Sequence, residues 1–199
     1  MKEKSLTDRA TILWRRLDLP GHDTAVLLQS PDGWHLSGVA VLAESDQPCR
    51  LEYEIACDSH WLTRRCSIHG YVGATTVALD VARSDTGEWT VGGALATSLT
   101  GCDDIDLGFS PATNLLPVRR LGLAVGARAV ARAAWVRFPE LTTEVLEQAY
   151  TRLSLDHYLY ESAGGTFRRE LVVDRVGFVL DYPDLWRAET TVRYLDPVA

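Results

Sequence analysis

Alternating apolar and polar residues are the dominant pattern of the chain and predict short β-strands. The clearest case is residues 50–57 (RLEYEIAC), where Leu51, Tyr53 and Ile55 occupy every second position and glutamates stand between them. This period of two is typical of a strand with one buried and one solvated face. Comparable strands are expected at residues 24–29, 34–42, 61–69, 75–82, 88–92, 158–162, 167–174, 177–182 and 190–195.

Turn residues separate the expected strands. Residues 30–33 (SPDG) and 84–87 (SDTG) are predicted to be turns, because proline presets a negative φ and glycine accepts a positive one. Regularly spaced strands with such turns predict an antiparallel sheet that curls or closes on itself. No linker, repeat or low-complexity segment divides the chain, so residues 1–199 are expected to form one all-β domain.

Two segments in the second half fit either a helix or a strand. The alanines of residues 125–138 (VGARAVARAAWVRF) favour a helix, whereas its WVRF end is typical of a strand. Residues 142–153 (TTEVLEQAYTRL) fit both periods. The residues themselves therefore leave both alternatives open for these two segments.

The stretch Gly101–Leu121 (GCDDIDLGFSPATNLLPVRRL) combines three aspartates with the start signal of a helix. Ser110 followed by Pro111 predicts a helix that begins here, with serine as N-cap and proline at the first helical position. Pro117 is expected to limit this helix to about two turns.

Asp103, Asp104 and Asp106 precede this helix, and Arg119 and Arg120 are expected beyond its end. A structural clamp between the two sets is favoured, because arginine offers forked donors to carboxylates. Contact with a ligand and catalysis are the alternatives. A calcium loop is disfavoured, because the turn glycine and the bidentate glutamate of such a loop are missing.

The net charge and the composition of the chain indicate which classes of partner it is not expected to bind. The formal net charge is −7 and the sequence pI is about 5.2, which disfavours nucleic acid and anionic membranes. The N-terminus lacks the apolar core of a signal peptide and no run is long enough to span a bilayer, so we expect no stable membrane insertion and a cytoplasmic location. The four cysteines and five histidines lack zinc-site spacing, and no metal or other cofactor is expected.

The central stretch resembles the signature of a bacterial family named "putative glycolipid-binding" proteins. Three further segments match this family's pattern in order, namely LEYEIACDSHWLTRRCSI, AWVRFPEL and residues 158–186. The resemblance implies a single-domain antiparallel spiral β-roll that holds lipid-like ligands, and the one short helix expected from Ser110 and Pro111 lies in its central motif. It also implies that residues 127–138 and 144–153 are strands, and it supplies no catalytic residue.

A half-open roll of this kind is expected to bury an acyl chain on its apolar face and to orient a polar head with aromatic and charged groups at the rim. The candidate ligand-binding residues are Trp61, Arg64, Asn114, Arg119, Arg120, Tyr158, Tyr160 and Trp186. Core packing, backbone capping or internal ion pairing is the alternative role of each. The residues expected to form the structural clamp are Asp58, Asp103, Asp104 and Asp106.

Three functions from different classes are compatible with these features. The favoured one is non-enzymatic binding of a glycolipid-like or other amphipathic small molecule in an apolar groove. The first alternative is a small enzyme that uses Asp104 or Asp106 with Arg119 or Arg120, which requires a polar pocket holding a carboxyl group of raised pKa. The second alternative is a scaffold that homodimerises through a sheet edge or face.

Overall fold

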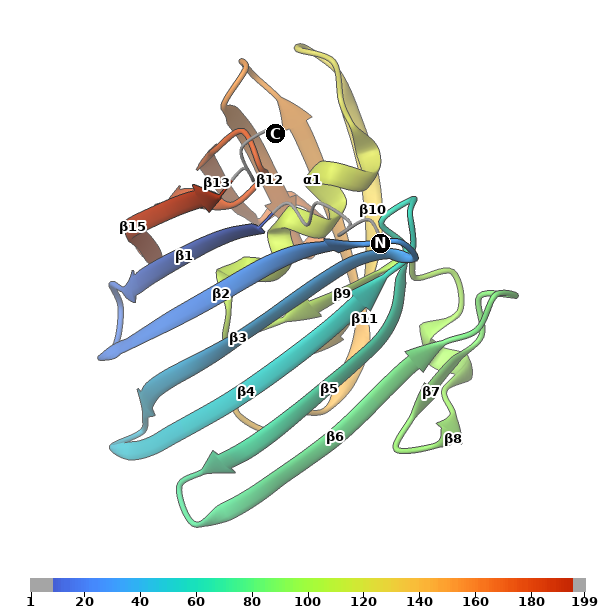
Figure 1. The fold of residues 1–199 in the computed structure, drawn as a ribbon, viewed down its shortest axis with the longest axis vertical. Coiled ribbons are helices and arrows are strands. Elements are labelled where there is room, and N and C mark those ends of the chain that lie inside the picture. Colours follow the sequence, from blue (N-terminus) through green and yellow to red (C-terminus); the bar gives the residue numbers. More distant parts are fainter. Residues whose placement is uncertain (1–8, 195–199) are drawn as a thin grey trace, which may run out of the picture.

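The computed structural model describes residues 9–194 and shows one continuous, curled β-sheet (Figure 1). In the described chain the strands follow the order β8-β7-β6-β5-β4-β3-β2-β1-β15-β14-β13-β12-β11-β10-β9. The strands are β1 (Arg9–Arg16), β2 (Gly21–Ser30), β3 (Gly33–Glu44), β4 (Gln47–Cys57), β5 (Thr63–Val72), β6 (Thr75–Arg83), β7 (Trp89–Val91), β8 (Ala94–Leu95), β9 (Asp104–Leu107), β10 (Arg128–Val136), β11 (Thr143–Arg152), β12 (His157–Ser162), β13 (Phe167–Val173), β14 (Val179–Tyr182) and β15 (Trp186–Tyr194). The helical segments are the 3-10 helices η1 (Thr97–Leu99), η2 (Pro111–Asn114) and η3 (Ala163–Gly165), and the α-helix α1 (Leu115–Leu121).

The sheet has two wings, which meet where the last described strand pairs with the first. In the first wing, β1 to β8, each strand is antiparallel to the next along the chain. The second wing contains β9 to β15, and β15 pairs antiparallel with β1. The pair β9–β10 is parallel, with Ile105 opposite Ala134. Strands β8 and β9 are the two edges, so the sheet curls without closing into a barrel.

The alternation seen in the sequence decides which side of the sheet is inside. In β4, Leu51, Tyr53 and Ile55 are buried, whereas Glu52 and Glu54 face solvent. Burial of apolar side chains on one face is the main stabilisation of such a sheet. The prediction of an all-β fold with one short helix in the central motif is confirmed.

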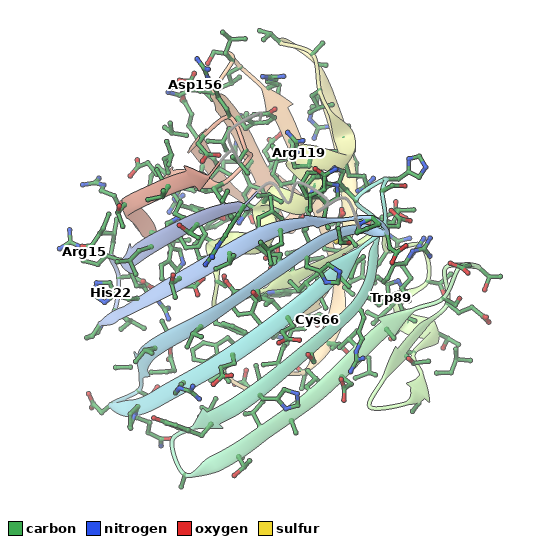
Figure 2. The ribbon with its side chains drawn as sticks, in the orientation of Figure 1. Arg15, His22, Cys66, Trp89, Arg119 and Asp156 are labelled. Atoms are coloured by element: carbon green, nitrogen blue, oxygen red, sulfur yellow. The ribbon has the colours of Figure 1, made fainter. Side chains whose placement is uncertain are left out.

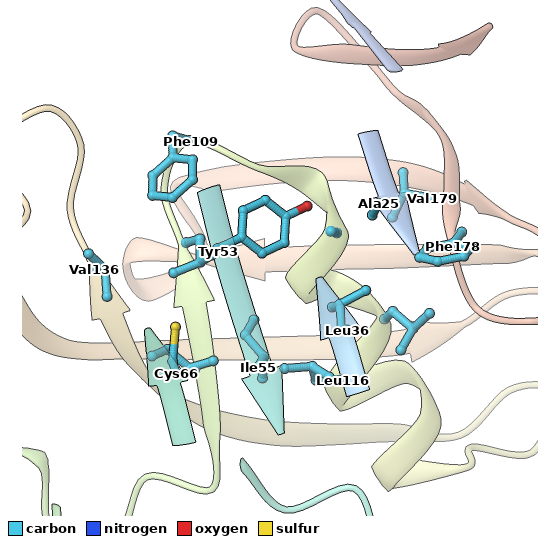
Figure 3. Packing of buried hydrophobic residues seen from close by; sticks show 14 of the residues in the cluster. Ala25, Leu36, Tyr53, Ile55, Cys66, Phe109, Leu116, Val136, Phe178 and Val179 are labelled. Atoms are coloured by element: carbon cyan, nitrogen blue, oxygen red, sulfur yellow. The ribbon is translucent and has the colours of Figure 1, made fainter. Parts of the chain in front are cut away.

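The helical segment of η2 and α1 packs into the concave side of the curl. Leu115 and Leu116 are completely buried. Figure 3 shows Leu116 close to Leu36 and Ile55, which project from the first wing. Side chains of the helical segment and of both wings therefore fill much of the interior.

The helical segment departs from the prediction in two respects. Pro117 does not limit the helix, because it is the third residue of α1, where a missing N–H breaks no intrahelical hydrogen bond. Arg119 and Arg120 lie in the last turn of α1 and not beyond its end. The predicted cap is confirmed, since the Ser110 side chain accepts a hydrogen bond from the backbone N–H two residues on.

The two ambiguous segments are strands β10 and β11, as the resemblance implies. Ala131, Ala133 and Ala134 of β10 are buried in the sheet, so tertiary packing overrides their helix propensity. Strands β1, β8 and β9 have no counterpart in the prediction. In β9 the polarity of its two aspartates conceals the strand.

Among the described residues, no helix combines the length and the hydropathy needed to cross a membrane. The same residues contain no group of three or more His, Cys, Asp or Glu side chains that is placed to hold a metal ion. The four cysteines are buried and are free thiols.

Candidate binding site

A cavity of about 350 Å³ lies between the start of the helical segment and the second wing. Its apolar wall is formed by Leu107, Pro111, Trp135, Leu146, Phe167, Leu185 and Trp186. Polar groups enter the wall from Asp106, Ser110, Asn114, Tyr160, Ser162 and Tyr182. Apolar walls with a few placed polar groups are typical of small-molecule sites, which have volumes of roughly 300–1,000 Å³.

Two polar residues of the cavity wall, Asp106 and Tyr160, are joined by Gln148 behind them in a hydrogen-bonded group that we call the polar cluster. Gln148 Nε2 donates to Asp106 Oδ2 at 2.7 Å and to the Tyr160 hydroxyl oxygen at 3.1 Å. Burial raises the pKa of Asp106 to about 6, although the Gln148 hydrogen bond lowers it. At neutral pH this carboxyl group is therefore mostly ionised, and it remains close to its titration range.

Strand register positions the polar cluster. Gln148 lies opposite Ser162, and Tyr150 lies opposite Tyr160, on the antiparallel pair β11–β12. Residues two apart on a strand share a face, so these four side chains point to the same side. The Tyr150 hydroxyl donates to Oδ1 of Asn114 at 3.0 Å, which ties β11 to the helical segment at the cavity wall.

The same alternation places Asp104 and Asp106 on one face of β9, but they have different partners. Arg120 donates to Asp104 through Nε at 2.9 Å and Nη2 at 2.6 Å, in a bidentate pair. Asp103 lies 3.2 Å from Arg83 Nη2 and 3.6 Å from Arg120 Nη1. We call Asp103, Asp104, Arg83 and Arg120 the carboxylate brace, because they join β9 to α1 and β6. Asp106, predicted as part of the clamp, contacts Gln148 and no arginine.

A second carboxyl group, Asp23 of β2, is completely buried beside the start of the helical segment. The Tyr53 hydroxyl donates to its oxygens at 3.1 and 3.3 Å, and the Ser110 hydroxyl donates to Oδ2. Burial raises the pKa of Asp23 to about 7, against the lowering effect of these hydrogen bonds. Gly38 makes room for this group, since a Cβ there would lie 2.2 Å from the Tyr53 hydroxyl oxygen.

The corner between β4 and β5 is organised by Asp58. Its Oδ1 accepts hydrogen bonds from the backbone N–H groups of His60 at 2.8 Å and Leu62 at 3.0 Å. Its Oδ2 accepts from Arg64 Nη2 at 2.7 Å and Nε at 3.1 Å. This corner holds Trp61 with a positive φ of 68°, a conformation that bulky residues rarely adopt.

The predicted binding residues do not gather in one place. Asn114, Tyr160 and Trp186 line the cavity. Trp61 and Arg119 border a separate cleft of about 50 Å³ at the other end of the helical segment. There the Arg119 guanidinium lies 5.1 Å from the centre of the Trp61 ring.

The remaining predicted residues have internal partners. Arg64 pairs with Asp58 and Arg120 with Asp104, so both guanidinium groups are engaged inside the protein. Tyr158 lies under the guanidinium of Arg152, 5.5 Å from it, and lines a third hollow.

Sequence reasoning misses several residues that shape the cavity and its surroundings. Gln148 lies in a segment whose period is ambiguous, so its inward direction is not readable. Phe167 and Leu185 stand at a strand start and in a turn, where alternation gives no face. Asp23 does carry a signal, because it shares the inward face of β2 with Ala25.

Comparison with known proteins agrees with this architecture. The sequence model of the family described as "Putative glycolipid-binding" matches residues 11–188. The chain belongs to this family. The resemblance noted from the central stretch is thereby confirmed for most of the chain.

Two solved structures are similar to this chain. A DUF1089 family protein from Pseudomonas aeruginosa is 36% identical, with 83% of this chain and 91% of that chain covered and a TM-score of 0.75. A β-barrel-like protein of the domain of unknown function DUF1849 from Brucella abortus is 14% identical, with 95% and 98% covered and a TM-score of 0.54. The second likeness shows the fold alone. No curated protein matches the chain.

Proposed function

We propose that this protein binds an amphipathic small molecule, with an apolar part and a hydroxyl-bearing head, in the cavity beside the polar cluster. The observation that carries the proposal is the composition of the wall. Apolar side chains such as Phe167 and Leu185 face a space into which Asp106 and Tyr160 also open. A glycolipid-like molecule has this same division between an apolar part and a hydroxyl-rich head.

The volume of the cavity limits which part of a ligand it can enclose. About 350 Å³ is at the lower end of the range for ligand sites. We therefore expect the cavity to take one sugar ring or one chain segment, with the rest of a larger lipid outside. The name of the family supports the lipid-like class of ligand.

The test is binding of octyl glucoside below its micellar concentration, measured by native mass spectrometry and calorimetry on gently purified protein. In Leu146→Trp a larger side chain enters the cavity from a partly exposed position, and we expect at least tenfold weaker binding. The matched control is Val130→Trp, which adds the same side chain at an exposed position outside the cavity wall.

Equal affinity of Leu146→Trp and wild type would place the ligand elsewhere. Failure of the wild type to carry or take up any glycoside or lipid across a broad panel would overturn the proposal.

A second candidate function is proton transfer by Asp106, favoured by a carboxyl group of raised pKa that faces a cavity. The arginines of the original hypothesis are not at this cavity, since Arg120 pairs with Asp104 and Arg119 lies against Trp61. Glycoside hydrolysis normally needs two carboxyl groups, and Asp106 is the single acid among the described wall residues. Binding is therefore preferred. Nitrophenol release from a panel of nitrophenyl glycosides and esters, no faster in wild type than in Asp106→Asn, would exclude the enzyme.

The homodimeric scaffold, the cytoplasmic location and the exclusion of nucleic acid stay predictions. The edges that a homodimer would use are β8 and β9.

A further inference from the structure

We infer that a second site, at the C-terminal end of α1, binds a phosphate-type oxyanion. The first observation concerns ion pairing. Apart from Arg9, the arginines whose side chains the structure describes each pair with a carboxylate, except Arg119, Arg152 and Arg175. All three exceptions border one hollow of about 350 Å³.

Gathering unpaired positive charge in one place is unfavourable unless something offsets it, and this chain has a net charge of −7. Arg152 donates to the backbone carbonyl oxygens of Leu123, Ser154 and Leu155 at 2.8 to 3.1 Å. These bonds engage all three nitrogens of the guanidinium but leave its full charge in place. An anionic ligand would neutralise the hollow.

One carboxylate, Asp174, also borders the hollow. Its Oδ1 accepts hydrogen bonds from the backbone N–H groups of Val176, Gly177 and Phe178, at 2.8 to 2.9 Å. The carboxylate thus shapes the turn between β13 and β14, and this turn carries Arg175 toward the hollow.

Arg119 is held in position before any ligand arrives. It projects from α1 (Figure 2). Its aliphatic stem crosses Gly177, where a Cβ would lie 3.1 Å from Arg119 Cδ. Its guanidinium stacks over Trp61, whose own ring stacks on Trp34 with centroids 4.3 Å apart. A bulky residue with positive φ stores strain that often marks a functional site, and Trp61 is such a residue.

Arg119 and Arg175 border both the hollow and the cleft of about 50 Å³ beside Trp34 and Trp61. This cleft exceeds the space of one water molecule, roughly 30 Å³, and is of the order of a small oxyanion. Guanidinium groups offer forked donors that match phosphate oxygens. We therefore place the oxyanion between these two arginines and the remainder of its carrier in the hollow, next to Tyr158.

Arg119 in the last helical turn also complements the helix dipole. Arg175 lies on a separate turn and has no such role, so the dipole does not explain why both are present. The hollow shares no wall residue with the cavity of the proposed function, so this inference does not depend on it.

The experiment compares the full chain with two double variants of equal charge. Arg119→Gln with Arg175→Gln removes the site. Arg65→Gln with Arg132→Gln removes two exposed, carboxylate-paired arginines of strands β5 and β10. The single variant Arg175→Gln keeps the packing of Arg119 on Trp61. It therefore tests the site even if the double variant fails to fold. The probes are inorganic phosphate and glycerol 3-phosphate, followed by calorimetry, and phosphatidylcholine vesicles with and without phosphatidylglycerol, followed by sedimentation.

We expect wild type and the control variant to bind at least one phosphate-bearing probe, and the site variant to bind it at least tenfold more weakly, with a smaller loss for Arg175→Gln. Binding of the soluble probes identifies a free phosphate compound, and binding of the anionic vesicles alone identifies a lipid head group. Equal losses in the two double variants would show that only net charge matters, and absence of binding to every probe would equally overturn the inference.

Discussion

Asp104 and Asp106 lie two residues apart on the same face of β9, yet they belong to different environments. Asp104 accepts one hydrogen bond from Arg120 on each of its oxygens, within the carboxylate brace. Asp106 has one amide donor, from Gln148, and opens to a cavity. The strand sets the direction of both side chains, and the neighbouring elements decide their roles. The brace is a closed unit, whereas the polar cluster keeps capacity for an incoming molecule.

The largest effect is expected when the brace is broken from its arginine side. Arg120→Ala leaves Asp104, whose side chain is 1% exposed, buried and without its bidentate partner. Loss of one member of a buried ion pair typically costs about 3–5 kcal/mol. Urea denaturation measures this as a fall in the free energy of unfolding.

The matched control for the brace is Arg187→Ala. Arg187 pairs with Asp181 on the surface, and exposed pairs contribute about 0–1 kcal/mol. Similar losses for the two variants would contradict the view that the brace is a structural unit.

The next effect, which depends on pH and is smaller for each pH unit, is expected from Asp23. Its pKa is about 7 in the folded protein against an ordinary value of 3.8, so the folded state holds this proton more tightly. Stability should fall as pH rises between these values, by at most about 1.4 kcal/mol per pH unit. The Asp23→Asn variant has no carboxyl group at this position, so its stability lacks this dependence on pH.

The measurement for Asp23 is the difference in unfolding free energy between wild type and Asp23→Asn, from pH 4 to pH 8. We expect the difference to shift in favour of the variant as pH rises. A difference that stays flat across this range would show that Asp23 is not buried as a titrating group.

The smallest effect is expected at the polar cluster. Above its pKa of about 6 the Asp106 carboxylate accepts a stronger hydrogen bond from a sugar hydroxyl than the neutral acid does. Affinity for octyl glucoside should therefore be about fivefold higher at pH 7.5 than at pH 5. Calorimetry on Asp106→Asn should show no such dependence, and an equal dependence in this variant would assign it to another group.

Much of the fold is predictable from local patterns. The alternation of Leu51, Tyr53 and Ile55 fixes both the strand and its buried face. The alanine-rich β10 needs the family resemblance, because its helix propensity conflicts with its packing. Strand β9 escapes prediction, since Asp104 is buried only by virtue of an arginine that lies sixteen residues away.

The candidate site is less predictable, because it depends on pairing between distant segments. Arg119 and Arg120 are adjacent in sequence and equivalent in chemistry. Arg120 turns inward to Asp104 and Arg119 turns outward onto Trp61, and only the orientation of α1 distinguishes the two. Gln148 approaches Asp106 across strands that the sequence does not align.

The pairing of β1 with β15 has a consequence for how the molecule is assembled. The first wing consists of hairpins between neighbours in sequence, which close short loops and form quickly. The seam between the wings joins the two extremes of the described chain and must wait for the last strand to be made. During synthesis on the ribosome, the nascent first wing would thus present β1 as an open edge. The β1–β15 hydrogen bonds would be the last strand pairing to form.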